Sequence, residues 1–121
     1  MIGKKNWVFC DGYLPPHGDN SDFEGHEALM ITNLNAQKAN IELVFVFEDK
    51  EPLTYVTLTL DGMRTTCVRL DKPLGKEGVL LGEAVQYTVW VKSDVPICAC
   101  FGRLDVRQSN MAYYSLSGYS F

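Results

Sequence analysis

The chain has 121 residues, of which 46% are hydrophobic and 12% aromatic, and this is enough for one domain with its own core. Its 15 acidic and 11 basic residues give a formal charge of −4, which argues against broad nucleic-acid binding through the phosphates. The longest apolar runs, residues 43–47 and 95–101, are too short to cross a membrane, and residues 1–6 lack the apolar segment of a secretory signal. We therefore expect a cytoplasmic protein that does not insert into a membrane.

The first half of the chain predicts four short strands. Residues 7–10 form the first strand, and a loop rich in Gly, Pro, Asn and Asp follows over residues 11–22. Residues 26–32 form the second strand. Residues 41–47 show the clearest alternation of apolar side chains, and residues 54–60 alternate in the same way before an Asp-Gly turn.

The second half of the chain predicts four more strands. Residues 65–70 form the fifth strand, and a second long connection follows over residues 71–78. Residues 84–92 alternate apolar and polar side chains and form the sixth. Pro96 opens a separate seventh strand, because proline favours strand starts and edges. The tail, residues 111–121, is rich in tyrosine and serine and supplies the last strand.

About eight short strands, regular turns and the lack of a helical period indicate an all-β fold. We expect a single antiparallel β-sandwich of jelly-roll type, which occupies residues 1–121 as one domain. No repeat, heptad pattern or domain boundary is visible in the sequence.

The four cysteines do not form a disulfide or zinc pattern. Cys98 and Cys100 are two residues apart on one strand face, where their Cβ atoms are too far apart for a disulfide. Cys10 and Cys67 stand alone in apolar strand contexts. Neither C-x-x-C nor a paired Cys/His spacing occurs. We therefore expect four free, small, buried thiols.

Catalytic and metal-binding patterns find little support in this sequence. Neither histidine, His17 or His26, lies beside a nucleophile motif, and no G-x-S-x-G sequence occurs. His26 and Glu27 are adjacent in a strand and point to opposite faces, so they do not form a metal-binding pair. We predict no catalytic residue, no metal site and no cofactor.

The most informative polar pattern is a row of alternating charges near the C-terminus. In an extended strand every second residue shares a face, so Arg103, Asp105 and Arg107 form a plus-minus-plus row. Leu104 and Val106 then point into the core. Such a row is either a satisfied salt-bridge ladder, at the surface or at a subunit contact, or a prearranged site for a polar or anionic ligand.

An ordered set of short motifs runs from about Trp7 to Tyr119, nearly the whole chain. The set comprises Trp7, Asp11-Gly12-Tyr13-x-Pro15-Pro16, His26-Glu27, Asn33, Asp49-Lys50-Glu51-Pro52, Arg64, Val68-Arg69, Ser93-x-Val95-Pro96-Ile97 and Arg103-Leu104-Asp105-x-Arg107-Gln108. No single motif is specific, but the set as a whole resembles the sensory rhodopsin transducer family. The connection over residues 71–83 carries no matching motif.

This resemblance implies a small soluble β-sandwich of jelly-roll type that assembles into a homotetramer. It also implies a role without catalysis. The founding members couple to a light-sensing membrane rhodopsin, and the wider superfamily looks like small-molecule-binding domains for sugar-like ligands. Carried over by position, the candidate ligand-binding residues are Tyr13, His26, Glu27, Asn33, Glu51, Arg64, Arg69, Arg103 and Asp105.

We therefore expect a non-catalytic signalling and binding domain. Its ligand is a small polar, sugar-like molecule or a partner protein such as a membrane photoreceptor. The alternative is a structural subunit whose charged row forms an oligomer contact. Two lesser alternatives are a carbohydrate-acting enzyme, which needs two carboxylates at catalytic distance, and a DNA-binding regulator, against which the net negative charge argues.

Overall fold

The computed structural model describes residues 1–16, 24–107 and 111–121. The strands in this part of the chain are β1 (Lys4–Tyr13), β2 (His26–Asn33), β3 (Ala39–Phe47), β4 (Leu53–Leu60), β5 (Arg64–Arg69), β6 (Gln86–Asp105), β7 (Ala112–Leu116) and β8 (Tyr119–Ser120). All the strand pairs are antiparallel, so the predicted all-β fold is confirmed. Among the described residues there is no helix with the length and apolar character needed to span a membrane.

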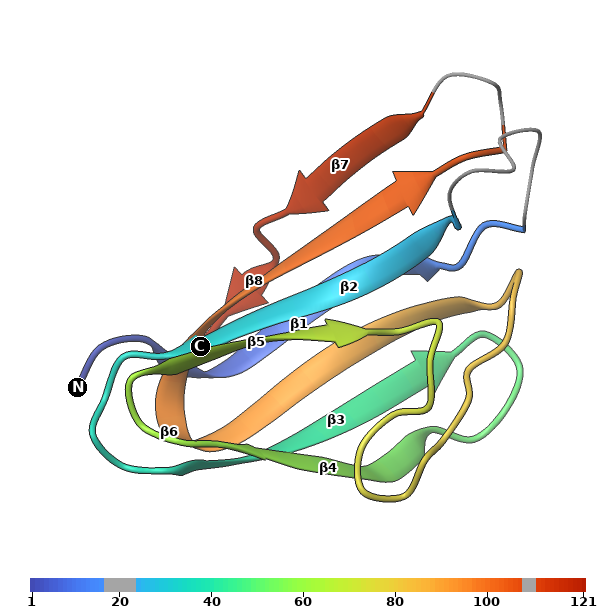
Figure 1. The fold of residues 1–121 in the computed structure, drawn as a ribbon. Helices are drawn as coiled ribbons and strands as arrows, with labels where there is room; N and C mark the ends of the chain where they lie inside the picture. The colour runs from blue at the N-terminus through green and yellow to red at the C-terminus, as the bar shows by residue number, and fades with distance from the viewer. Residues whose placement is uncertain (17–23, 108–110) are drawn as a thin grey trace.

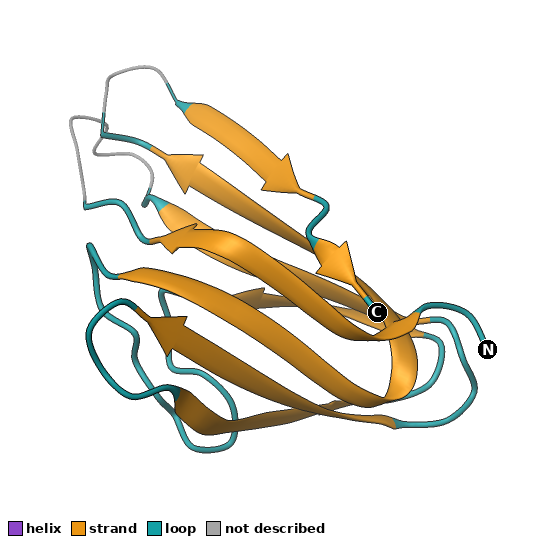
Figure 2. Cartoon of the chain, turned by 180° about the vertical axis from the view of Figure 1, so that it is seen from behind, coloured by secondary structure: helices purple, strands orange, loops and turns teal. Residues whose placement is uncertain are grey.

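Two layers of strands face each other, and β6 belongs to both of them (Figure 1). We call the layer with the order β4-β3-β6-β1-β8 sheet A, and the layer with the order β5-β2-β6-β7 sheet B. The first half of β6 pairs with β1 and β3, whereas the second half pairs with β2 and β7. Figure 2 shows the same bent strand from behind. The predicted β-sandwich is therefore confirmed.

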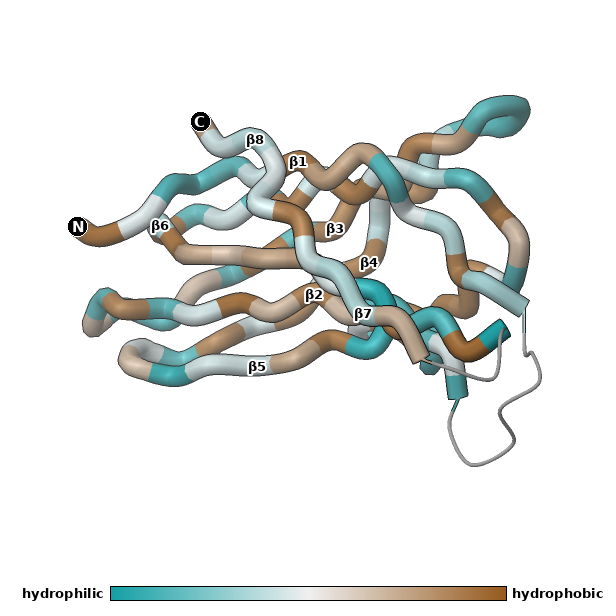
Figure 3. Tube along the Cα trace, turned by 90° about the horizontal axis from the view of Figure 1, so that it is seen from above, coloured by the Kyte–Doolittle hydropathy of each residue, from teal (hydrophilic) through white to brown (hydrophobic). Residues whose placement is uncertain are grey.

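Alternating apolar residues on the inner faces of the two sheets form the core. Phe9, Leu43 and Phe45 of sheet A are fully buried, as are Leu29 and Phe101 of sheet B. The alternation is visible along the strands in Figure 3. Burial of a large apolar side chain stabilises the fold by about 1.5–3 kcal/mol. The rings of Phe9 and Phe101 connect the sheets, with their centroids 5.8 Å apart.

The region that was expected to hold two strands forms the single long strand β6, of 20 residues. Pro96 lies where β6 passes from one sheet to the other, between Ser93, which pairs with β3 of sheet A, and Cys98, which pairs with β2 of sheet B. Residue 96 has no partner in either ladder, so the missing N–H of proline removes no ladder hydrogen bond. The expected last strand, in contrast, divides into β7 and β8, with Gly118 at a φ of 69° between them.

The four cysteines are free, as predicted, but they do not lie in the core. Cys10 and Cys67 are exposed, and Cys98 and Cys100 are partly exposed. The prediction of buried thiols is therefore wrong. The apolar neighbours that suggested burial, such as Phe101 next to Cys100, point to the inner face. The cysteines themselves point to the outer faces, because successive residues of a strand face opposite sides.

The connections gather at the two ends of the sandwich. We call the end with the start of β2, the β3–β4 turn and the β5–β6 connection the loop end; it lies on the right in Figure 1. We call the end with the β2–β3 and β4–β5 turns, the bend of β6 and both termini the turn end; it lies on the left.

Candidate functional site

Most of the predicted site residues lie together at the loop end. They are Tyr13 in β1, His26 and Glu27 in β2, Arg69 in β5, and Arg103 and Asp105 in β6. The ladder between β2 and the second half of β6 places Glu27 directly opposite Arg103. Strand pairing, and not proximity in the sequence, therefore assembles this group.

Glu27 is a carboxylate with no exposed surface. It shares the inner face of β2 with Leu29 and Ile31, because every second residue of a strand points the same way. Its Oε1 accepts a hydrogen bond of 2.6 Å from the Tyr87 hydroxyl. Its Oε2 accepts hydrogen bonds from the Tyr13 backbone N–H, at 2.9 Å, and from Arg103 Nε, at 3.0 Å. A buried charge is tolerated when it is paired in this way.

Arg103 continues the inner face of β6 beyond Phe101, and only 11% of its side chain is exposed. Besides its bond to Glu27, it donates from Nη2 to the Asp11 carbonyl oxygen at 2.8 Å. Its guanidinium lies 5.0 Å from the ring centroid of Tyr114 and 5.9 Å from that of Tyr13. Arg103 therefore ties β1, β2 and β7 to the end of β6 through ionic, hydrogen-bond and cation–π contacts.

The predicted plus-minus-plus row forms only in part. Arg103 turns toward Glu27, which lies opposite it on the neighbouring strand. Asp105 instead pairs with Arg107, which lies beyond the end of β6. Arg107 Nη2 donates a hydrogen bond to Asp105 Oδ2. The bonds from Arg107 hold the pKa of Asp105 below its usual range. Val106 is buried as expected, whereas Leu104 is only partly buried.

Tyr87 is a member of the cluster that the sequence did not reveal. It appeared only as one residue of an alternating strand, yet its hydroxyl reaches Glu27. The Tyr87 ring lies against Gly12, where any Cβ atom would overlap it, so the glycine leaves room for this contact. Burial, and then the negative charge of Glu27, raise the pKa of Tyr87 far above its usual value. The phenol therefore stays protonated and acts as a donor.

No pattern in the sequence points to Tyr114 either. Its hydroxyl is buried and has no hydrogen-bond partner among the residues that the structure describes. Burial raises the pKa of this phenol, so it too stays protonated. A buried hydroxyl without a partner costs about 1–3 kcal/mol. It is therefore a polar group that a bound water or ligand atom is able to satisfy.

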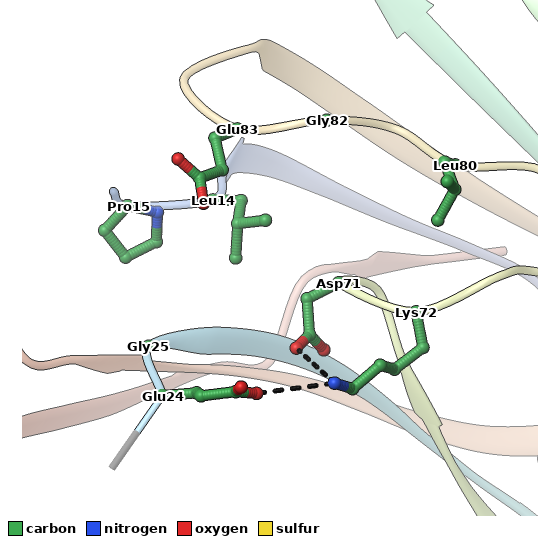
Figure 4. Close-up of a pocket in the computed structure, with 9 residues that line it drawn as sticks. All are labelled: Leu14, Pro15, Glu24, Gly25, Asp71, Lys72, Leu80, Gly82 and Glu83. Carbon is green, nitrogen blue, oxygen red and sulfur yellow. Dashed lines mark hydrogen bonds and ion pairs between the residues drawn. The ribbon is translucent and has the colours of Figure 1, made fainter. Parts of the chain in front are cut away.

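A pocket of about 460 Å³ opens at the loop end beside this cluster (Figure 4). Its walls come from the end of β1, the segment before β2 and the β5–β6 connection. The lining residues are Leu14, Pro15, Glu24, Gly25, Asp71, Lys72, Leu80, Gly82 and Glu83. In Figure 4, Leu14, Pro15 and Glu83 lie on one side of the pocket, and Glu24, Asp71 and Lys72 lie on the other.

The charged side of the pocket is held in place by a network of ion pairs. Lys72 Nζ lies 3.3 Å from Glu24 Oε2 and 3.9 Å from Asp71 Oδ2. Arg69 donates two hydrogen bonds to Asp71, at 2.8 and 2.7 Å. Burial alone would raise the pKa of Asp71, but the bonds and charge of Arg69 outweigh it and lower this pKa. Asp71 therefore stays ionised at neutral pH.

Of the other predicted residues, one lies beside the pocket and three lie away from it. His26 Nδ1 lies 3.1 Å from the Glu24 carbonyl oxygen, next to the pocket. Asn33 and Arg64 pair in the β2–β5 ladder at the turn end. Glu51 lies in the β3–β4 turn and lines a separate groove. The nine predicted residues thus do not form one site.

Two residues named from the sequence, His17 and Gln108, lie outside the described residues. Within the described part, no group of three His, Cys, Asp or Glu side chains is placed to hold a metal ion. The carboxylate of Glu27 already accepts hydrogen bonds from the guanidinium of Arg103 and the phenol of Tyr87. Such an arrangement suits the positioning of strands.

Comparisons with known proteins agree with this architecture. No curated protein gives a match. The solved structure of Thermotoga maritima 1070 is 30% identical, with a TM-score of 0.86, and the match covers 100% of this chain and 97% of that one. The structure of the Anabaena sensory rhodopsin transducer is 32% identical, with a TM-score of 0.74 over 89% of this chain and 94% of that one. The family model described as Anabaena sensory rhodopsin transducer matches residues 2–120, and the chain therefore belongs to this family.

Proposed function

We propose that this protein is a non-catalytic binding and signalling domain whose pocket at the loop end takes a small polar, sugar-like ligand. The observation that carries this proposal is the pocket itself, with about 460 Å³ of space between the end of β1 and the β5–β6 connection. This volume lies within the range of small-molecule sites, about 300–1,000 Å³.

The lining of the pocket supports a polyhydroxylated ligand. A sugar offers hydroxyl donors around its edge and apolar C–H groups on its faces. The carboxylates of Glu24, Asp71 and Glu83 are acceptors for such hydroxyls. Leu14 and Leu80 are apolar surfaces on which a ring is able to rest. The pocket thus offers both kinds of contact that a sugar requires.

The buried cluster supports a signalling role, because it connects the walls of the pocket to other strands of the fold. Leu14, which lines the pocket, follows Tyr13, whose backbone N–H bonds to Glu27. Gly25, on the opposite wall, comes two residues before Glu27. A ligand that shifts either wall therefore acts on a carboxylate that contacts β1 and β6. The name of the Anabaena relative, a sensory rhodopsin transducer, supports a receptor protein as the signalling partner.

Isothermal titration calorimetry tests the proposal with a panel of neutral mono- and disaccharides and organic acids of similar size. We expect a sugar to bind. Glu83→Gln removes a charged acceptor of the ligand, and Lys72→Gln breaks the ion pairs that hold Glu24 and Asp71 in place, so each should weaken binding about tenfold or more. Lys38→Gln, at the turn end, is the matched control and should bind as wild type does. No binding across the panel, or equal binding by the pocket variants, would reject this pocket; turnover of a bound sugar would reject the non-catalytic role.

A second candidate function is an oligomer-forming subunit, as expected from the family resemblance. It is supported by exposed apolar side chains around the two termini: Ile2 is 58% exposed, Tyr119 66% and Phe121 51%. The rings of Tyr119 and Phe121 lie with their centroids 5.5 Å apart. Light scattering coupled to size exclusion should give a homotetramer for wild type and a smaller species for a Tyr119→Ser, Phe121→Ser variant. An unchanged mass in that variant would exclude this surface as the contact.

A further inference from the structure

The outer face of sheet B carries sulfur atoms that neither the core nor the loop-end pocket uses. In the ladder between β2 and β6, Met30 lies directly opposite Cys100. Cys98 lies two residues before Cys100 on the same strand, and Cys67 of β5 lies on the other side of Met30. A row of soft donor groups therefore crosses this face.

The alternation of the strands fixes the direction of these side chains. Leu29 and Ile31, on either side of Met30, are fully buried, so Met30 points outward. Phe101 is also fully buried, so Cys100 points outward, and Cys98 shares its face. Cys98 and Cys100 are partly exposed and free. An ion from solution is therefore able to reach their sulfur atoms.

The spacing suits one ion held between two thiolates and a thioether. Residues two apart on a strand face are separated by roughly 6.6–6.8 Å, and directly opposite residues by about 4.5–5.5 Å at Cβ. A metal bound to two thiolates at about 2.3 Å spans up to about 4.6 Å between the sulfurs. Side-chain rotation is able to bring the two cysteine sulfurs to this span, and the flexible Met30 side chain is able to reach them from the neighbouring strand.

Cys67 is too far away to complete this group. It lies two strands from Cys100, about 9–10 Å away at the spacing of β-strands, which exceeds the span of one metal ion. This agrees with the finding that no group of three His, Cys, Asp or Glu side chains in the described residues is placed to hold a metal. The third donor is then the thioether of Met30.

We propose that Cys98, Cys100 and Met30 bind one soft monovalent cation of the Cu(I) class. Thiolate and thioether donors select Cu(I), whereas structural zinc sites almost always use four nitrogen or thiolate ligands. Binding converts the two thiols to thiolates and releases two protons, and no electron is transferred. The site is separate from the loop-end pocket, so it does not depend on the sugar-binding proposal.

Anaerobic titration of the fully reduced protein with Cu(I), in competition with a coloured Cu(I) chelator, tests the site. We expect one Cu(I) per chain held by the proposed residues. Mutation of a residue that only supports a metal ligand lowers the metal affinity by up to roughly a hundredfold. Cys98→Ser and Cys100→Ser remove a ligand itself, so each should lower the Cu(I) affinity by more than that. Met30→Leu, which keeps the size of the side chain, should give a smaller loss. Ag(I), which is stable in air, should compete for the same site.

Two cysteine variants serve as matched controls. Cys67→Ser removes a thiol from the same sheet face, and Cys10→Ser removes an exposed thiol from sheet A. Both should keep the wild-type affinity and stoichiometry, and thermal unfolding of every variant should show that the fold is retained. Tight binding that survives both Cys98→Ser and Cys100→Ser, or a stoichiometry that falls with each cysteine removed, would overturn the proposal.

Discussion

Both ends of the sandwich bury polar side chains, but they use different chemistry. At the loop end the buried groups are charged, with Glu27 bonded to Arg103 and Tyr87. At the turn end they are neutral amides. Asn35 donates to the carbonyl oxygens of Pro96, at 2.8 Å, and Ile2, at 3.0 Å, and accepts from the Ile2 N–H at 2.9 Å.

The difference follows from the kind of polar group that needs a partner at each end. At the turn end, tight turns leave backbone N–H and C=O groups without strand partners, and an amide side chain offers both a donor and acceptors to them. At the loop end, side chains from β1, β2, β6 and β7 meet beside a pocket. A charged pair there holds several strands in one arrangement, but it also makes that arrangement sensitive to loss of either partner.

The largest expected effect is at the buried carboxylate. Glu27→Ala removes the buried charge partner of Arg103 and leaves only the exposed Asp11 carboxylate, 3.9 Å from Arg103 Nη2. We expect a loss of about 3–5 kcal/mol in the free energy of unfolding. Urea unfolding measures this loss. Glu42→Ala, which breaks the exposed pair with Lys92 on sheet A, is the control and should cost less than about 1 kcal/mol. Equal losses in the two variants would mean that the loop-end cluster does not hold the strands together.

A smaller effect is expected when only the phenol is removed. Tyr87→Phe keeps the ring against Gly12 and removes the donor to Glu27, a hydrogen bond to a charged group worth about 1.5–3 kcal/mol. The same urea experiment measures it. Tyr55→Phe, at an exposed tyrosine of β4, is the matched control and should leave stability unchanged. If Tyr87→Phe also leaves it unchanged, the hydroxyl has no structural role.

A substitution at the turn end should lower the stability of the fold but leave the sugar affinity unchanged. Asn35→Ala leaves the backbone groups of Ile2 and Pro96 without partners and should cost about 1–3 kcal/mol. Calorimetry should show the same sugar affinity as wild type, because the pocket is at the other end. A matching loss of affinity in Asn35→Ala would show that the two ends are coupled.

The sequence predicted features that depend on neighbouring residues, but not contacts between distant strands. The alternation in residues 41–47 predicted β3 and its core face, because a strand pattern depends only on neighbours in the chain. The partner of Arg103 was not predictable in this way, since Glu27 lies 76 residues away and meets it only through the β2–β6 register. Likewise, Pro96 interrupted the pattern but not β6, because the strand changes sheets at that point.

Two aspartates allow the comparison to be made through acid titration. The pKa of Asp71, at the loop end, is lowered because the bonds and charge of Arg69 outweigh the effect of burial. The pKa of Asp94, at the turn end, is lowered by hydrogen bonds from the side chain and backbone of Asn40. A carboxylate with a lowered pKa stabilises the fold above its unfolded pKa, near 3.9, and this contribution disappears as the pH falls through the folded value.

Removal of the partner should therefore have different consequences at the two ends. In Arg69→Gln, the bonds and charge of Arg69 no longer offset burial, and Lys72, 3.9 Å from Asp71 Oδ2, remains as a nearby cation, so the pKa of Asp71 should rise. In Asn40→Ala, the exposed Asp94 loses a neutral partner, and its pKa should move only part of the way back because the bond to the backbone N–H remains. Carbon-detected NMR titration of the two carboxyl groups measures both shifts. A larger shift at Asp94 than at Asp71 would contradict the distinction between a charged loop end and a neutral turn end.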